Sequence, residues 1–132
     1  MNISNLTKLE VFTSKGDDGA KTYHVEIDLI KKTAKFMNRN FYLLKNEKNK
    51  GMLNITATAI EQFKMNLQEI NFPEWENDYQ NFALYNTGFY LNVILHFDDL
   101  TKDIKGNHYT PPQWDKFKSA ISEIIGQKFS ES

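Results

Sequence analysis

A change of hydrophobic period in the last third of the chain constrains the fold more than any other feature. Large apolar residues occupy every second position from Phe89 to Phe97, the pattern of an antiparallel strand with one buried face. From Trp114 to Ile125 they recur every three or four positions, as on one side of a helix. We predict a turn-rich loop over 99–112 between them, with Pro111 or Pro112 at the helix entrance. The tail therefore predicts a strand and a helix that pack on one core.

Strand signals dominate the first half of the chain. Alternation and β-branched residues predict strands at 6–13, 23–29, 33–38 and 41–44, the last two being two short strands or one strand with a bulge. Polar loops are predicted at 14–22 and 46–51. Further along, Asn86-Thr87-Gly88 between 81–85 and 89–97 predicts a hairpin. Most connections between strands are therefore expected to be hairpins.

One more helix is predicted in the middle of the chain. Its apolar stripe consists of Ile60, Phe63, Leu67 and Ile70, and Pro73 ends the pattern. Thr58 followed by Glu61 has the form of a capping box, and Thr56 is a rival N-cap. The element order, roughly β-β-β-β-α-β-β-α, predicts an α+β fold. We expect residues 1–132 to form a single domain with one antiparallel sheet of four to six strands and two helices packed on one face.

Composition excludes several classes of protein. Of the 132 residues, 40% are hydrophobic, enough for a real core, and none is cysteine, so disulfides and thiolate metal sites are impossible. No apolar run approaches the roughly 18 residues of a membrane span, and the N-terminus lacks a signal peptide's apolar region. We expect a cytoplasmic protein without a membrane partner. The abundance of Asn, Lys and Ile hints at a bacterial or phage source.

Charge is spread unevenly along the chain. The net charge of −1 gives no global field for nucleic acid, so a nucleic-acid partner is not expected. Residues 31–50, however, hold seven basic residues and one acidic residue, whereas residues 51–101 hold seven acidic residues and one basic residue. The two segments either balance each other within the fold or form patches that face a partner. The pattern neither forbids nor demands the pairing of strand edges between two copies.

The C-terminal third resembles that of small bacterial proteins of unassigned activity. The likeness lies in the alternating strand that ends His96-Phe97-Asp98-Asp99, in an element similar to G-x-N-x-Y-x-P, and in the aromatic helix that follows. In this chain the element is Gly106-Asn107-His108-Tyr109-Thr110-Pro111, with one residue fewer before the asparagine. The resemblance implies an α+β fold. It implies no activity.

No constellation of residues predicts catalysis. The chain has no G-x-S-x-G element and no phosphate-binding glycine pattern, and the pairs Asp17-Asp18 and Asp98-Asp99 are typical of turns. His24 and His96 fall on the polar phases of two predicted strands. If those strands pair, the two imidazoles and nearby carboxylates could form a metal- or ligand-binding face; a solvated sheet face is the simpler interpretation. We predict no catalytic residue, no metal and no cofactor.

The basic segment 30–51 has two interpretations. Its lysines and arginine alternate with Phe36, Phe41 and Tyr42, a composition compatible with single-strand nucleic-acid binding. The simpler interpretation is an edge strand that lysines protect against aggregation, with the aromatic residues in the core.

An acidic and aromatic segment is the strongest candidate for a binding site. Rigid aromatic anchors and carboxylates suit contact with a basic partner, and the predicted partner-binding residues are Glu74, Trp75, Glu76, Asp78 and Tyr79. The alternative is that Phe72 and Trp75 fold back on the first helix and close the core. From this segment we expect a non-enzymatic protein-binding inhibitor, an immunity-type protein that occludes a basic partner such as a nuclease toxin. A phage-borne accessory or anti-defence protein would have the same kind of surface.

Overall fold

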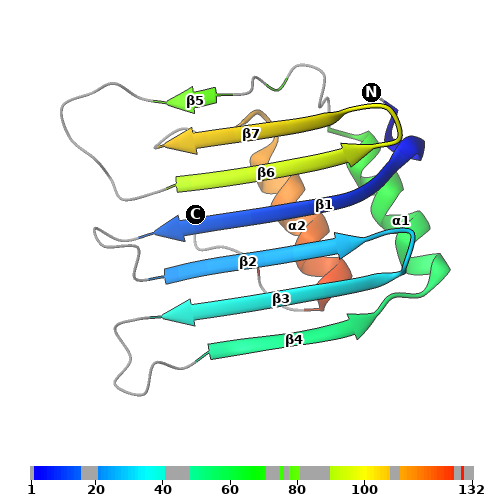
Figure 1. Ribbon diagram of the computed structural model, residues 1–132, viewed down its shortest axis with the longest axis horizontal. Helices are drawn as coiled ribbons and strands as arrows, with labels where there is room; N and C mark the ends of the chain where they lie inside the picture. Colours follow the sequence, from blue (N-terminus) through cyan, green and yellow to red (C-terminus); the bar gives the residue numbers. More distant parts are fainter. Residues whose placement is uncertain are drawn as a thin grey trace.

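Seven strands form one sheet in the part of the chain that the computed structural model describes, residues 2–15, 21–40, 48–70, 75, 78–80, 90–107, 111–126 and 129 (Figure 1). The strands are β1 (Leu6–Lys15), β2 (Lys21–Asp28), β3 (Thr33–Asn40), β4 (Lys48–Asn54), β5 (Asp78–Gln80), β6 (Tyr90–Phe97) and β7 (Thr101–Asn107). Their spatial order is β4-β3-β2-β1-β6-β7-β5. All neighbours pair antiparallel except the short edge strand β5, which runs parallel to β7.

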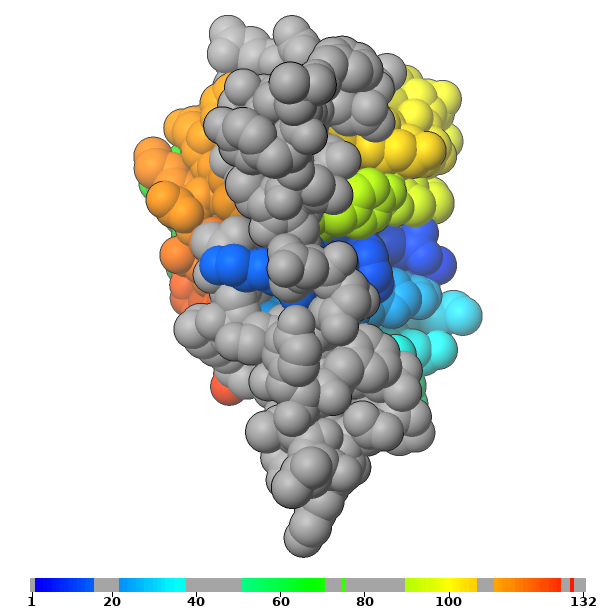
Figure 2. All heavy atoms as spheres, turned by 90° about the vertical axis from the view of Figure 1, so that its left-hand side faces the viewer, coloured from blue at the N-terminus to red at the C-terminus, as the bar shows by residue number. Residues whose placement is uncertain are grey.

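Both helices, α1 (Ala57–Gln68) and α2 (Trp114–Ile125), pack on the same face of this sheet (Figure 1). A short 3₁₀ turn, η1 (Ile3–Asn5), precedes β1. Figure 2 shows the two layers from the side, with α2 in orange on one side and the strands on the other. The predicted fold class, one antiparallel sheet with two helices on one face, is confirmed. The sheet has one strand more than predicted, the three-residue β5.

The core lies between the sheet and the helices, and β1 runs through its centre. Leu9 pairs with Ile27 of β2 on one side and with Leu95 of β6 on the other, and all three side chains are fully buried. Alternate residues of each strand therefore supply the apolar layer, as period-2 patterning requires. The helices add the residues that their stripes predict, chiefly Phe63, Leu67, Phe117 and Ile121.

Helix α1 begins at the rival cap. Thr56 is the N-cap, and its hydroxyl accepts a hydrogen bond from the Ala59 amide at 3.1 Å. The predicted capping box of Thr58 and Glu61 is therefore wrong, because both residues already lie inside the helix. Helix α2 follows Gln113, which has a left-handed backbone (φ 61°), and Gly126 (φ 73°) ends the helix in the same conformation. Such a glycine end-cap is common because glycine has no Cβ to clash.

Two predicted loops are strands. Residues 101–107 of the predicted loop 99–112 form β7, and β4 begins at Lys48 inside the predicted loop 46–51. Each segment is mostly polar and has few apolar residues, so pairing with a neighbouring strand, rather than local propensity, determines its structure. The predicted strand 41–44 lies outside the described residues, and so do residues 81–89 of the predicted hairpin between 81–85 and 89–97. Its second strand is β6, whose two edges pair with β1 and β7, so the predicted pairing of β6 with 81–85 is wrong. Of the helices that the structure describes, none is long and apolar enough to span a membrane.

Candidate functional site: the open face of the sheet

The sheet face opposite the helices carries the residues that alternate with the core. On β1 these are Lys8, Glu10, Phe12 and Ser14, and all four are half-buried. Each of these residues lies directly opposite a residue of β2 on one side and of β6 on the other, and the pairing continues to β3, β4 and β7. The open face therefore consists of rows of paired residues, and each row crosses the strands from β4 to β7. The rows are of two kinds, one rich in paired charges and one rich in rings, and we describe them in turn.

Ion pairs hold the charged half of the open face together. Glu10 and Glu26 lie directly opposite each other, an arrangement that costs energy for like charges. Lys8 contacts Glu26 at 3.1 Å, and Nε2 of His96 contacts Glu10 at 2.9 Å. The hydrogen bond to Glu26 raises the pKa of Lys8, aided by the charges of Glu26, Glu10 and Asp28, while desolvation opposes it. Exposed pairs of this kind contribute only about 0–1 kcal/mol, so they add little to stability, and the Lys8 ammonium offsets the charge of Glu26.

The other two carboxylates of this face also have partners within the protein. Asp28 accepts hydrogen bonds from the amides of Ile30, at 3.0 Å, and Lys31, at 2.8 Å, and so closes the β2–β3 turn. Asp103 accepts one from the side-chain amide of Asn92 at 2.7 Å. These acids therefore make hydrogen bonds within the sheet itself, and both keep their negative charge because their donors are neutral amides.

Aromatic rings form the second half of the face. Phe12 lies between His24 and Tyr90, with ring centroids 6.3 Å and 6.2 Å away. The three residues come from β2, β1 and β6, which are consecutive strands of the sheet. His24 is exposed, Tyr90 is 37% exposed and Phe12 is half-buried. A row of accessible rings thus crosses the middle of the sheet.

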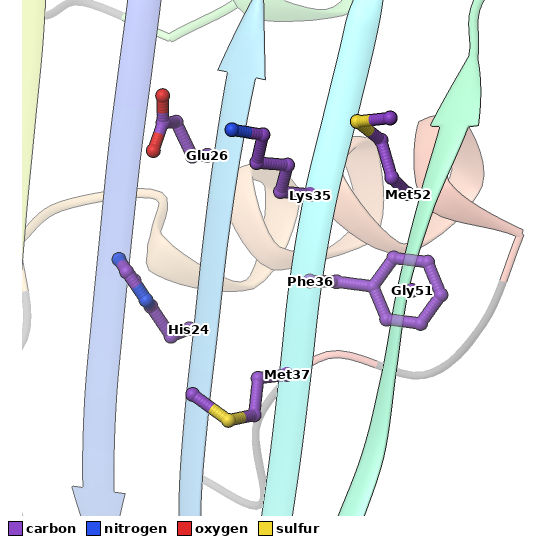
Figure 3. Close-up of a pocket in the computed structure, with 7 residues that line it drawn as sticks. All are labelled: His24, Glu26, Lys35, Phe36, Met37, Gly51 and Met52. Atoms are coloured by element: carbon purple, nitrogen blue, oxygen red, sulfur yellow. The ribbon is translucent and has the colours of Figure 1, made fainter.

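A groove of about 440 Å³ lies beside this row, over β2, β3 and β4 (Figure 3). His24, Lys35 and Glu26 line it together with two thioethers, Met37 and Met52, of which Met52 is 65% exposed. The floor is formed where Gly51 faces Phe36 across β3 and β4. A Cβ on Gly51 would meet the Phe36 ring at 3.0 Å, so glycine allows the ring to lie against the edge strand.

Trp75 lies in the core, and the expectation that its indole faces a partner is wrong. Its side chain is 2% exposed and packs on Trp114 and Phe117 of α2, with centroids 6.5 Å and 5.4 Å away. The indole N–H donates to the carbonyl of Pro112 at 3.0 Å, which satisfies the one polar group that burial would otherwise penalise. The alternative interpretation is that Phe72 and Trp75 fold back on the first helix and close the core. Trp75 does close the core, but against α2, and Phe72 lies outside the described residues.

The remaining predicted binding residues surround this buried anchor in the sequence. Asp78 and Tyr79 belong to β5, where Asp78 pairs with Lys105 and Tyr79 with Gly106 of β7. Glu74 and Glu76, the immediate neighbours of Trp75, lie outside the described residues. The chain is therefore fixed at residue 75 by burial and at 78–80 by strand pairing.

The two histidines are not neighbours. Strand β1 lies between β2 and β6, so the condition for a joint His24 and His96 site, direct pairing of their strands, is not met. His24 lies in the row of Phe12, whereas His96 lies in the row of Lys8 and contacts Glu10. Among the residues that the structure describes, no group of three or more His, Asp or Glu side chains could hold a metal ion.

Sequence reasoning missed the aromatic row. Phe12 and Tyr90 directly adjoin Val11 and Leu91, which point into the core, so each is an apolar residue out of phase with its strand. Such out-of-phase rings are the signal that could have identified an apolar patch on the outer face. Comparison with known protein families finds no family model that matches the chain. Comparison with curated proteins finds no match either.

Proposed function

We propose that the protein is a non-enzymatic, protein-binding inhibitor of the immunity type, whose acidic segment 74–78 engages a partner with a basic surface. The segment has three carboxylates in five residues. Carboxylates at such density steer the approach of a basic protein and pair with its Lys and Arg side chains. Occlusion of a positively charged site, such as that of a nuclease toxin, is the proposed mechanism.

The observation that carries the proposal is the anchoring of this segment by Trp75. Ile70, two residues beyond the end of α1, is 3% exposed and Trp75 is 2% exposed, so burial fixes the chain at both positions. Gln113 ties the same region together, since its side-chain amide donates to the Glu69 carbonyl at 3.0 Å. A binding segment that is held in place before contact loses less conformational entropy on association.

The test compares the full chain with a triple charge-reversal variant, Glu74→Lys, Glu76→Lys and Asp78→Lys. Both are immobilised and exposed to lysate of the native host, and a captured partner is then purified for association-rate measurements. We expect a basic protein that binds the wild-type chain and associates at least tenfold more slowly with the variant, because steering charges act mainly on the association rate.

A matched control reverses three exposed acids elsewhere, Glu61, Asp98 and Asp99. It changes the net charge by the same amount, so equal slowing by both variants would reject a specific role for segment 74–78. Undiminished binding by the first variant would reject the proposal as well. A phage-borne anti-defence protein would use the same surface, and a toxin gene beside this gene would favour the immunity role.

A further inference from the structure

The open face divides by charge along its strands. Two adjacent rows at the β1 end near Lys15 contain no acidic residue between β4 and β7, although they contain four basic ones. In order from β4 to β7, the rows are Lys50, Met37, His24, Phe12, Asn92 and Lys105, and then Lys48, Arg39, Thr22, Ser14, Tyr90 and Asn107. Beyond β7, Asp78 of β5 adds one acid at the far edge.

The four acids of the face, Glu10, Glu26, Asp28 and Asp103, all fall in the other two rows. Each has an intramolecular partner, as described above. An anion that lies across these two rows between β4 and β7 therefore meets basic residues and no carboxylate in its own rows, while the acids of the next row are Glu10, Glu26 and Asp103. This segregation is the first observation that points to a polyanion.

The same two rows contain the aromatic residues of the face. His24, Phe12 and Tyr90 provide three rings on three consecutive strands, separated by 6.3 Å and 6.2 Å. Accessible rings on an antiparallel sheet are a surface on which unpaired bases stack, and the bases of a flexible single strand can splay to such spacings. A duplex cannot use these rings because its bases are already stacked and paired.

From the overlap of acid-free cationic rows with the accessible ring row, we infer that this half of the open face binds single-stranded nucleic acid. Bases stack on His24, Phe12 and Tyr90, and the exposed Lys105 lies at the β7 end of the row of His24 and Phe12 for contact with phosphates. The inference does not rest on the proposed function, which uses segment 74–78. It takes up the interpretation of segment 30–51 as a surface that binds single-stranded nucleic acid. The rings, however, come from β1, β2 and β6, and not from that segment.

The test measures binding of fluorescein-labelled oligo(dT) and oligo(rU), each about ten nucleotides long, to the full chain by fluorescence anisotropy. We expect saturable binding at low salt. If three phosphates are contacted, affinity falls about twentyfold between about 50 and 200 mM salt, from a slope of about −0.7 per phosphate for single strands.

Ring and charge variants separate stacking from electrostatics. Tyr90→Leu removes the ring but keeps apolar bulk, and should weaken oligonucleotide binding about tenfold, whereas Tyr90→Phe should retain it. Lys105→Gln should lower the salt slope by about 0.7. The matched control, Lys116→Gln on the exposed side of α2, should change neither quantity.

Four results would overturn the inference: no saturable binding at low salt, equal affinity for a duplex of the same length, no loss with Tyr90→Leu, or equal loss with Lys116→Gln. A heparin fragment of matched charge serves as a polyanion without bases. If Tyr90→Leu weakens heparin binding as much as oligonucleotide binding, stacking is not the cause and the inference fails. Thermal unfolding of each variant confirms that the fold is retained.

Discussion

The acidic neighbours of Trp75 in the sequence suggest an exposed side chain, whereas the structure buries that side chain in the core. Acidic neighbours make a tryptophan look like part of a binding site, but the indole fills a space against Trp114 and Phe117 and donates to Pro112. The sequence contains both possibilities, because composition does not give the direction of a side chain. What distinguishes them is a distant hydrogen-bond acceptor, the Pro112 carbonyl, which lies 37 residues away in the chain.

We predict that Trp75→Phe lowers the free energy of unfolding by about 2–3 kcal/mol. The change leaves part of the indole volume empty and the Pro112 carbonyl without its donor, and both effects cost energy in a core. Urea unfolding followed by circular dichroism measures the loss. A change below about 0.5 kcal/mol is the usual result for an exposed position, and it would contradict burial of the indole.

A second prediction about a single residue concerns Gly51 in the edge strand β4. An added Cβ would normally stabilise by reducing the entropy of the unfolded chain, but here it meets the Phe36 ring at 3.0 Å. We predict that Gly51→Ala destabilises the protein by about 1 kcal/mol, at the low end for overpacking, because Phe36 is half-buried and can shift.

The double variant tests the cause of that effect. In a Phe36→Leu background the close contact is gone, so Gly51→Ala should be neutral or stabilising, as measured by chemical unfolding. If alanine costs the same in both backgrounds, the Phe36 ring is not the reason that position 51 is glycine.

At the scale of elements, the beginning of α1 makes a direct comparison possible. We predict that Thr56→Ala costs about 1 kcal/mol, because the Ala59 amide loses its acceptor. Thr58→Ala should be neutral or slightly stabilising, since alanine is the better helix former inside α1. Thermal and urea unfolding of the two variants measure the difference, and the reverse order would restore the predicted capping box.

Elements with strong local patterns were predictable, and those defined by pairing were not. β1, β2 and β6 alternate clearly, and the stripes of α1 and α2 identify both helices, because period is a local property. β7 has one buried apolar residue in a strand, Ile104, and β5 has only three residues, so their pairing partners determine them. Alternation of apolar and polar residues along a strand does not show which other strand it pairs with.

The candidate sites follow the same rule. Alternation predicted that His24 lies on an outer face, but it could not predict that β1 separates β2 from β6 and brings Phe12 between His24 and Tyr90. The ring row depends on the strand order, and no residue in it predicts the other two. The acidic segment, in contrast, is continuous in sequence and could be recognised without the fold.

At the scale of the whole molecule, the basic segment 31–50 and the acidic residue Asp78 lie toward opposite edges of the sheet. Residues 31–50 include β3 and the start of β4 at one edge, and Asp78 belongs to β5 at the other. The two edge strands are six steps apart in the strand order, or about 29 Å at about 4.8 Å per step. That separation exceeds the Debye length of about 8 Å at physiological salt, so the two edges cannot balance each other within the fold.

We therefore predict that charge changes at the two edges are energetically independent. In a double-mutant cycle, Lys50→Glu in β4 and Asp78→Lys in β5 should have additive effects on the free energy of unfolding, within about 0.3–0.5 kcal/mol at about 0.15 M salt. Urea unfolding at two protein concentrations provides the measurement. A larger coupling that is the same at both concentrations would mean that the edges interact within one molecule. One that grows with concentration would mean that the basic edge of one copy meets the acidic edge of another, which the separation of charge would then explain.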